Sequence, residues 1–297
     1  MKIGIIGGGA IGLLTAGYLC SGNHQVTVYV KRGIQKQKIN ENGIKLLPVD
    51  KTYWVKALHI SEIEQEDLLI VTVKQYHVQD VFQEIAVLPS VPFVFLQNGM
   101  GHIDTMKELS QHHSVFAGVL EHGAVRINEH TVEHTGKGLM RLASMQSYHR
   151  EAVWLADKIS LPGFPVTAEE EWFAMLADKL VINAVINPLT ALFHVQNGEV
   201  IGNRELNRIA RKLCQETCQV LNLNAERQWE RVSSVCRQTA KNHSSMKKDV
   251  ESGNRTEIDG ISGFLVEQAA EAVIPYTSFV YRSIKALEAL SKGDSYA

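Results

Sequence analysis

The sequence has little that would suit a secreted, nucleic-acid-binding or membrane protein. Its 297 residues include only four cysteines (Cys20, Cys214, Cys218 and Cys236), which lack the spacing of a disulfide framework. We therefore expect reduced thiols and a cytoplasmic protein. Thirty Lys and Arg residues oppose 32 Asp and Glu residues, and no run of five like charges occurs. The charge pattern thus gives no reason to expect nucleic acid or an anionic membrane as a partner.

Two apolar segments imitate export or membrane sequences. The segment from Ile3 to Cys20 is rich in glycine, and Tyr18 and Leu19 stand where a signal-peptide cleavage site requires small residues. The uncharged segment from Leu180 to Gly198 is long enough to span a bilayer, but Pro188 and several asparagines make insertion costly. We expect a soluble protein.

Short apolar runs alternate with helical patterns in the first half of the chain. The runs are rich in Val, Ile and Leu, as in strands of a parallel sheet covered on both faces. They are KIGII (2–6), QVTVYV (25–30), DLLIVTVK (67–74), VPFVFLQ (91–97) and VFAGVL (115–120). From about Glu169 apolar residues recur every three or four positions, which predicts helices.

The join between these halves falls near residues 161–170, where two prolines and a glycine punctuate the chain and Thr167 is placed to cap the next helix. Together with the length and the 45% hydrophobic content, this predicts two domains, 1–167 and 168–297. The expected fold class is α/β, with a Rossmann-type parallel-sheet domain followed by an all-helical domain.

A glycine-rich turn follows the first predicted strand. Gly7, Gly9 and Gly12 are in the register of a dinucleotide-binding loop, with Gly8, Ala10 and Ile11 between them, and a helical segment follows directly. Such a loop lets the backbone approach a pyrophosphate at a helix N-terminus. The alternative is a glycine-rich turn with no ligand.

The end of the second strand bears on the choice of dinucleotide. NAD-binding folds normally place an acid there, about 20 residues after the glycines, to hold the ribose 2′-hydroxyl. This sequence has Lys31 and Arg32 instead, and cations attract the 2′-phosphate of NADP(H). We therefore expect NADP(H), the alternative being two ordinary solvated cations.

Two later strands end in polar residues. Lys74 closes the third run, and Asn98 follows the fourth, at the carboxyl edge where open α/β sheets bind ligands. Asn98 and Gly99 could equally form a plain turn.

An unusual polar stripe lies on a predicted helix of the second half. Lys179, Asn183 and Asn187 recur at steps of four, so they share one helix face, while apolar residues fill the rest of the circumference. The stripe points either into an enclosed polar site or into a helix seam in which the asparagines satisfy each other.

Several motifs together resemble the ketopantoate reductase (2-dehydropantoate 2-reductase) family. These are GGGAIG, VTVK, QNGMG, DKLVINAVINPLTAL, NGE and SSMKKDVESGNRTEID, which follow the order and approximate spacing of that family over nearly the whole chain. The lysine-asparagine-asparagine helix and the last segment are specific to the family, whereas the glycine fingerprint is shared by many dehydrogenases.

The resemblance implies a role for individual residues. Lys179 corresponds to the proton donor, and the positions that hold the keto acid are Asn183, Asn187, Asn197, Asn242, His243, Ser244 and Ser245. Lys31, Lys74, Asn98, Ala124 and Glu257 correspond to positions that contact the cofactor or order the lysine, so Glu257 is assigned to both the catalytic and the cofactor group. The active site would lie in a cleft between the two domains.

The implied reaction is the NADPH-dependent reduction of 2-dehydropantoate to (R)-pantoate in pantothenate and coenzyme A biosynthesis. A lysine ammonium suits this chemistry, since hydride addition to a ketone develops negative charge on oxygen. The alternatives are a reductase of another branched 2-oxo acid and a non-catalytic NADPH-binding redox sensor. The histidines from His112 to His134 lack ligand spacing, so no metal is expected. The expected partner is a small keto acid, and a homodimer is compatible with the sequence.

Overall fold

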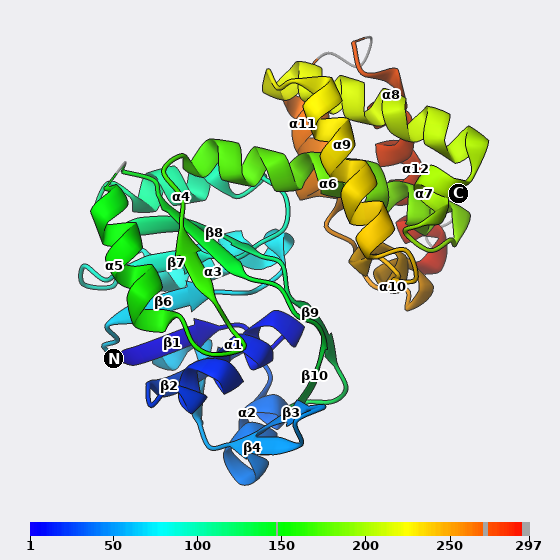
Figure 1. The fold of residues 1–297 in the computed structure, drawn as a ribbon. Helices are drawn as coiled ribbons and strands as arrows, with labels where there is room; N and C mark the ends of the chain where they lie inside the picture. The colour runs from blue at the N-terminus through cyan, green and yellow to red at the C-terminus, as the bar shows by residue number, and fades with distance from the viewer. Residues whose placement is uncertain (147, 270–272, 293–297) are drawn as a thin grey trace. The chain divides into compact units, whose positions relative to one another are not determined.

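The computed structural model describes residues 1–146, 148–269 and 273–292 (Figure 1). Its contacts divide the chain into two compact units. Unit 1 comprises Met1–Gln97 and His102–Met175, and unit 2 comprises Asn98–Gly101 and Leu176–Ala297. The short segment from Asn98 to Gly101 therefore packs with the helical half of the chain, although it follows a strand of the sheet.

Unit 1 contains an eight-stranded sheet in the order β12-β11-β8-β7-β6-β1-β2-β5. The strands are β1 (Lys2–Ile6), β2 (Gln25–Val30), β5 (Lys56–His59), β6 (Leu68–Val71), β7 (Phe93–Phe95), β8 (Val115–Leu120), β11 (Met140–Ser144) and β12 (Val166–Ala168). All neighbouring pairs are parallel except β11 and β8, which are antiparallel. The mainly parallel Rossmann-type sheet predicted from the apolar runs is confirmed.

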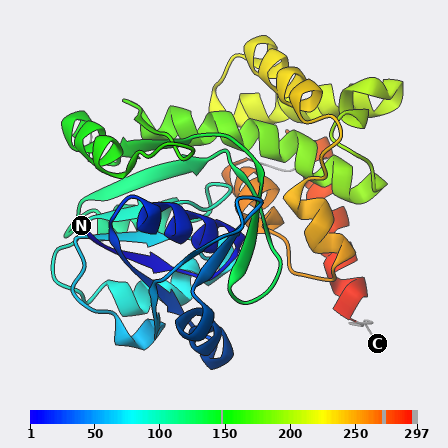
Figure 2. The same ribbon diagram turned by 60° about the horizontal axis from the view of Figure 1, so that its bottom comes forward.

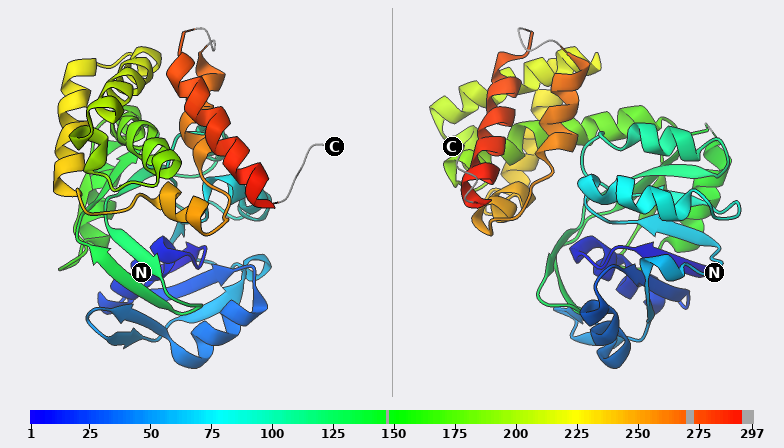
Figure 3. Two further views of the ribbon diagram at one scale, coloured as in Figure 1. Left: turned by 90° about the vertical axis from the view of Figure 1, so that its right-hand side faces the viewer. Right: turned by 180° about the vertical axis from the view of Figure 1, so that it is seen from behind.

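Helices cover both faces of this sheet. Those of unit 1 are α1 (Ala10–Ser21), α2 (Gly33–Asn42), α3 (Val78–Ile85), α4 (Ile103–Leu109) and α5 (His149–Ile159), with short 3₁₀ turns η1 (Ile60–Glu62) and η2 (Gln75–His77). Figure 1 shows α1 and α5 on the near face, and the view from behind in Figure 3 shows α3 and α4 on the other. Because both faces are covered, β2 and β8 bury nearly every side chain, which explains their continuous apolar sequences.

A second, four-stranded sheet packs against α1. It has the order β4-β3-β10-β9, from β3 (Ile44–Leu47), β4 (Lys51–Tyr53), β9 (Gly123–Arg126) and β10 (Thr131–Gly136). The apolar runs did not predict this sheet, because its strands are short and partly polar. The expectation that Thr167 caps a helix is wrong, since this residue lies in β12, parallel to β11, and the next helix begins only at Trp172.

The described part of unit 2 is helical (Figure 2). It contains most of α6 (Trp172–Phe193), then α7 (Glu199–Gly202), α8 (Arg204–Leu221), α9 (Ala225–Gln238), α10 (Ser245–Glu251), the π-helix η3 (Asp259–Gly263), α11 (Phe264–Gln268) and α12 (Pro275–Lys292). Local chemistry sets these boundaries: the side chains of Asn203 and Asn224 cap α8 and α9, and Asn222 ends α8 in the left-handed conformation.

Helix α6 is long and apolar enough to cross a membrane by length and composition. However, 67% of its apolar window is buried inside the protein, which is the environment of a core helix. The four cysteines, all within the described residues, are free thiols, and burial raises the pKa of Cys236 to about 11. Burial keeps that thiol protonated and unreactive.

Candidate functional site

The glycine loop of unit 1 is shaped to let a ligand approach its backbone. Gly7 has φ +114°, and a Cβ atom on Gly12 would lie 1.9 Å from the carbonyl oxygen of Gly7, so neither position accepts a side chain. A Cβ on Gly9 would meet no atom within 4 Å, which shows open space above this residue. Gly9 is also the N-cap of α1 and provides no side-chain cap. These features fit a dinucleotide pyrophosphate at the helix N-terminus.

Hydrogen bonds hold the loop at the carboxyl edge of the sheet. The Thr72 hydroxyl lies 3.1 Å from the carbonyl oxygen of Ile6 and 3.0 Å from that of Gly7. The amide of Gln35, a buried residue of α2, donates to the carbonyl oxygen of Gly8 over 2.7 Å. Ala10 and Ile11 begin α1 directly behind this loop. The loop is therefore fixed by side chains from α2 and from Thr72, which follows β6, as well as by its own glycines.

Both predicted 2′-phosphate residues lie beside β2, and each has an acidic partner. Lys31 pairs with Asp80 at 2.8 Å, and Arg32 pairs with Glu129. All four side chains are at least one quarter exposed, so these pairs are weak and a stronger anion can displace the carboxylates. Carboxylates from elsewhere in unit 1 thus lie beside both cations, which local sequence patterns do not predict.

Two further predicted cofactor residues belong to unit 1. Lys74 precedes the turn η2 and is half-buried. Ala124 lies on β9, opposite His134 of β10. Beside these, the amide of Gln97 donates to the carbonyl oxygens of Val71 and Val73, both at 3.0 Å, and so ties the end of β7 to that of β6.

The polar stripe lies on α6 within unit 2. Lys179 and Asn183 are half-buried and Asn187 is 7% exposed, while the apolar residues around them are almost all buried. The side-chain nitrogen of Asn183 is buried and has no hydrogen-bond partner among the described residues. An unpaired buried amide is costly, so the stripe is not a seam in which this amide is satisfied by a neighbour. The Asn183 side-chain nitrogen fits a hydrogen-bond donor to a bound ligand.

Asn197 shows the same feature. Its nitrogen donates to Thr239 Oγ1 over 2.9 Å, but its oxygen Oδ1 is buried without a partner among the described residues. Its backbone N–H donates to the carbonyl oxygen of Asn242 over 3.0 Å, so these two predicted substrate residues lie together.

The segment Asn242–Ser245 is fixed to α6 through Ser244. The Ser244 hydroxyl oxygen caps α10 by accepting the N–H of Lys247 over 3.1 Å, and it lies 2.7 Å from the Thr190 hydroxyl of α6. Ser245, at the first position of α10, and His243 are exposed. The structure therefore connects the stripe helix to the second predicted substrate segment.

Asn98 and Glu257 meet directly within unit 2. The Asn98 amide donates to the Glu257 carboxylate over 3.1 Å, and Glu257 is only 6% exposed. Gly99 has φ +83°, and a Cβ on it would lie 2.1 Å from the carbonyl oxygen of Gly260, which also accepts the N–H of Met100 over 2.8 Å. Asn98 and Gly99 therefore form more than a plain turn, because this segment also packs against η3.

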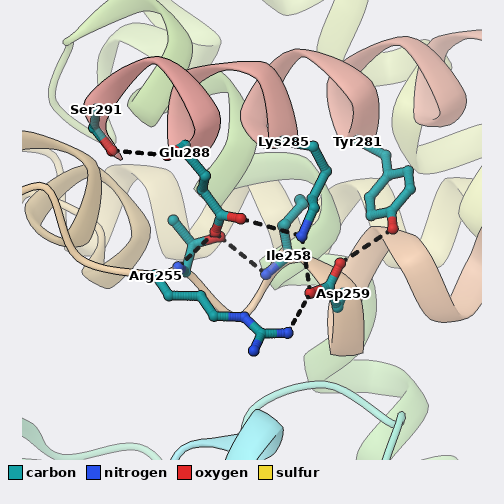
Figure 4. A network of polar contacts seen from close by, with 8 residues as sticks. Arg255, Ile258, Asp259, Tyr281, Lys285, Glu288 and Ser291 are labelled. Carbon is teal, nitrogen blue, oxygen red and sulfur yellow. Dashed lines mark hydrogen bonds and ion pairs between the residues drawn. The ribbon is translucent and has the colours of Figure 1, made fainter. Parts of the chain in front are cut away.

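A polar network from α12 holds the segment that contains Glu257 (Figure 4). Glu288 accepts hydrogen bonds from the backbone N–H and the hydroxyl of Thr256, both at 2.7 Å, and pairs with Lys285 at 3.2 Å. Asp259 in turn accepts from Tyr281 at 3.1 Å and pairs with Lys285. The cationic partners keep the pKa of Asp259 below its ordinary value, despite burial. Both sides of Glu257 are thus anchored to α12.

Helix α6 has a second anchor next to Lys179. The carboxylate of Asp178 accepts from Gln228 over 2.5 Å and from Arg231, both on α9. This pairing fixes the rotation of α6 about its axis, and with it the direction of the stripe. Sequence reasoning missed Asp178, Glu288 and Gln35, because their roles depend on partners distant in the chain.

Comparison with known proteins gives matches over most of the chain. The family model of the ketopantoate reductase PanE/ApbA matches residues 3–147, and that of its C-terminal domain matches residues 171–288. A 2-dehydropantoate 2-reductase of Bacillus subtilis is 41% identical over 294 residues, which cover 97% of this chain and 98% of the relative. That of Listeria innocua is 36% identical and covers 97% of each chain.

Solved structures have the same fold. A crystal structure of a probable 2-dehydropantoate 2-reductase from Bacillus subtilis matches with a TM-score of 0.87 and 40% identity, over 97% of this chain and 100% of that one. D-mandelate dehydrogenase in complex with NADH and anilino(oxo)acetate matches with a TM-score of 0.91 at 22% identity, over 98% and 99% of the chains. The latter likeness concerns the fold alone.

Proposed function

The chain belongs to the ketopantoate reductase family, and we propose that it catalyses the NADPH-dependent reduction of 2-dehydropantoate to (R)-pantoate, a step of pantothenate and coenzyme A biosynthesis. The observation that supports this most directly is the stripe of Lys179, Asn183 and Asn187 on a largely apolar helix, where the side-chain nitrogen of Asn183 is buried and has no hydrogen-bond partner among the described residues. The 41% identity to a 2-dehydropantoate 2-reductase over nearly the full length agrees with it.

We propose that the cofactor residues are those of the glycine loop, the cations after β2 and two strand ends. They are Gly7, Gly8, Gly9, Ala10, Ile11, Gly12, Lys31, Arg32, Lys74, Asn98, Ala124 and Glu257. The loop backbone and the positive end of α1 bind the pyrophosphate, and Lys31 and Arg32 bind the 2′-phosphate. Bound NADPH supplies the hydride.

The reaction's proton comes from Lys179. As the carbonyl carbon of the keto acid is reduced, negative charge develops on its oxygen, and the Lys179 ammonium stabilises that charge and then gives up a proton to the oxygen. The unpaired donor of Asn183 and the unpaired acceptor of Asn197 suit the carboxylate and the hydroxyl of the substrate, respectively. Asn187, Asn242, His243, Ser244 and Ser245 complete the proposed substrate set. Glu257, which accepts a hydrogen bond from Asn98, orders Lys179 in this proposal.

We further propose that residues 1–167 form the cofactor domain and residues 168–297 the substrate domain, that the enzyme works in the cytoplasm, and that it is a homodimer. The four free thiols support a reducing compartment. The Staphylococcus aureus ketopantoate reductase, which has the same fold, is dimeric. Light scattering after size exclusion tests the dimer.

The substrate assignment is tested with purified protein, NADPH and a pair of 2-oxo acids. Ketopantoate and 2-oxoisovalerate differ by a hydroxymethyl group, and a site built to hydrogen-bond that hydroxyl rejects the analogue by about 10² or more in kcat/KM. Equal turnover of both acids would favour a general branched 2-oxo acid reductase. NADPH binding without oxidation by either acid would favour a redox sensor.

A further inference from the structure

Glu129 occupies an unusual place beside the predicted 2′-phosphate site. It lies in the turn between β9 and β10, and its carboxylate contacts two cations, Arg32 at the start of α2 and Arg126 at the end of β9, the second at 3.5 Å. Its side chain is 27% exposed, less than that of Arg32. Asn128 stiffens the turn by accepting the backbone N–H groups of His130 and Thr131 over 3.0 and 2.8 Å. The carboxylate is thus held at a defined position.

Gln35 ties this turn to the glycine loop. Its side-chain nitrogen donates to the carbonyl oxygen of Gly8 over 2.7 Å and to that of Glu129 over 3.0 Å, and the residue is 4% exposed. Its oxygen lies 3.5 Å from the Arg32 guanidinium. One buried amide therefore links the glycine loop, the arginine and the turn, so Glu129 is held beside the predicted nucleotide site.

The two nicotinamide nucleotides differ at the group that this carboxylate would face. NADPH has a 2′-phosphate with up to two negative charges, which competes with Glu129 for Arg32 and is repelled by it. NADH has a hydroxyl there, which donates a hydrogen bond to a carboxylate, as the acid after the second strand does in NAD-binding folds. The same side chain therefore opposes one nucleotide and favours the other.

We propose that Glu129 is a specificity-determining residue that limits the preference of this enzyme for NADPH over NADH. Arg32 attracts the 2′-phosphate. Glu129 offsets that attraction because its carboxylate is paired with Arg32, and the phosphate must displace this carboxylate to bind. This inference rests on the proposed function, because it requires that the nucleotide bind at the glycine loop with its 2′ position near Arg32.

The test measures dissociation constants of NADPH and NADH by nucleotide fluorescence in the full-length protein, without substrate. Glu129→Gln keeps the size of the side chain and removes its charge. It should tighten NADPH binding about threefold to tenfold at low ionic strength and leave NADH binding unchanged or weaker. The gain should shrink in high salt, where exposed charges are screened.

Glu108→Gln is the matched control, because Glu108 is an exposed residue of α4 and its loss changes the net charge equally. It should leave the ratio of the two constants as in the wild type. An unchanged or reduced preference for NADPH in Glu129→Gln, or an equal gain in Glu108→Gln, overturns the inference. If wild-type protein binds NADPH and reduces ketopantoate in that case, the proposed function stands and only the role of Glu129 is wrong. If it binds neither nucleotide, both fail.

Discussion

The carboxylate of Glu288 should control the position of Glu257 from a distance, and Glu288→Gln tests this. The carboxylate is 7% exposed, accepts two hydrogen bonds from Thr256 and pairs with Lys285 (Figure 4). The amide keeps one acceptor oxygen but loses the charge that strengthens these contacts. Hydrogen bonds to a charged group contribute about 1.5–3 kcal/mol each. We expect unfolding free energy to fall by about 2–4 kcal/mol.

Activity should fall by more than this loss of stability explains. Thr256 directly precedes Glu257, so a shift of Thr256 also moves the Glu257 carboxylate, which accepts a hydrogen bond from Asn98. Stability is measured by urea unfolding, and kcat and KM for ketopantoate are measured where each variant is fully folded. We expect kcat/KM to fall about tenfold or more, the effect of misplacing a positioned group.

Glu216→Gln is a matched control, because Glu216 of α8 holds the other end of α12. Glu216 is also a buried carboxylate, and it accepts from the N–H of Tyr276 and from the N–H and hydroxyl of Thr277 at 2.8–3.0 Å. Its replacement should cost similar stability and leave kcat/KM of the folded protein unchanged. If both variants lose activity only in proportion to the unfolded fraction, the reasoning about Glu288 is refuted.

Three further outcomes are expected. Lys31→Asp should weaken NADPH binding far more than NADH binding, since only NADPH has the phosphate that a new carboxylate repels; equal losses in a binding titration would contradict the assignment. Asn183→Ala and Asn187→Ala should raise KM for the keto acid in steady-state assays, with any fall in kcat reporting lost orientation; unchanged KM would remove them from the substrate site. Burial lowers the pKa of His102 and His122 to about 4 from an ordinary value of 6.5, so the unfolded chain binds more protons between these values. Stability should therefore be complete above about pH 6.5 and decline toward pH 4, by about 2 kcal/mol at pH 5 for the fully buried His102 alone; a flat urea midpoint over this range would show that these groups do not titrate on unfolding.

Local patterns predict five of the eight strands of the main sheet, whereas β5, β11 and β12 show no such pattern. The runs at 25–30 and 115–120 coincide with β2 and β8, because strands buried on both faces need continuous apolar sequence. The small sheet escaped prediction, since β9 and β10 are half-polar and pair through a turn. The expected helix cap at Thr167 is wrong, because threonine suits a strand as well as a helix cap and here lies in β12.

For the candidate site, the sequence suggests which groups to propose for the chemistry but not what holds them in place. The stripe on α6 follows from helical periodicity alone. By contrast, Glu129 lies 97 residues from Arg32, and Glu288 lies 32 residues from Thr256. Long-range pairs of this kind leave no periodic signal, so only the folded chain shows the counter-ions and anchors around the site.

Lys179 is proposed to supply the proton while the cofactor binds to other residues. The most direct measurement is the single-turnover rate of NADPH oxidation by ketopantoate in Lys179→Ala, taken together with its melting temperature and its NADPH dissociation constant. Loss of a general acid should reduce the rate by about 10² to 10⁴, with NADPH binding and melting close to the wild type. A rate near that of the wild type, or one reduced only in proportion to the unfolded fraction, would contradict the claim and leave the stripe a structural feature of α6.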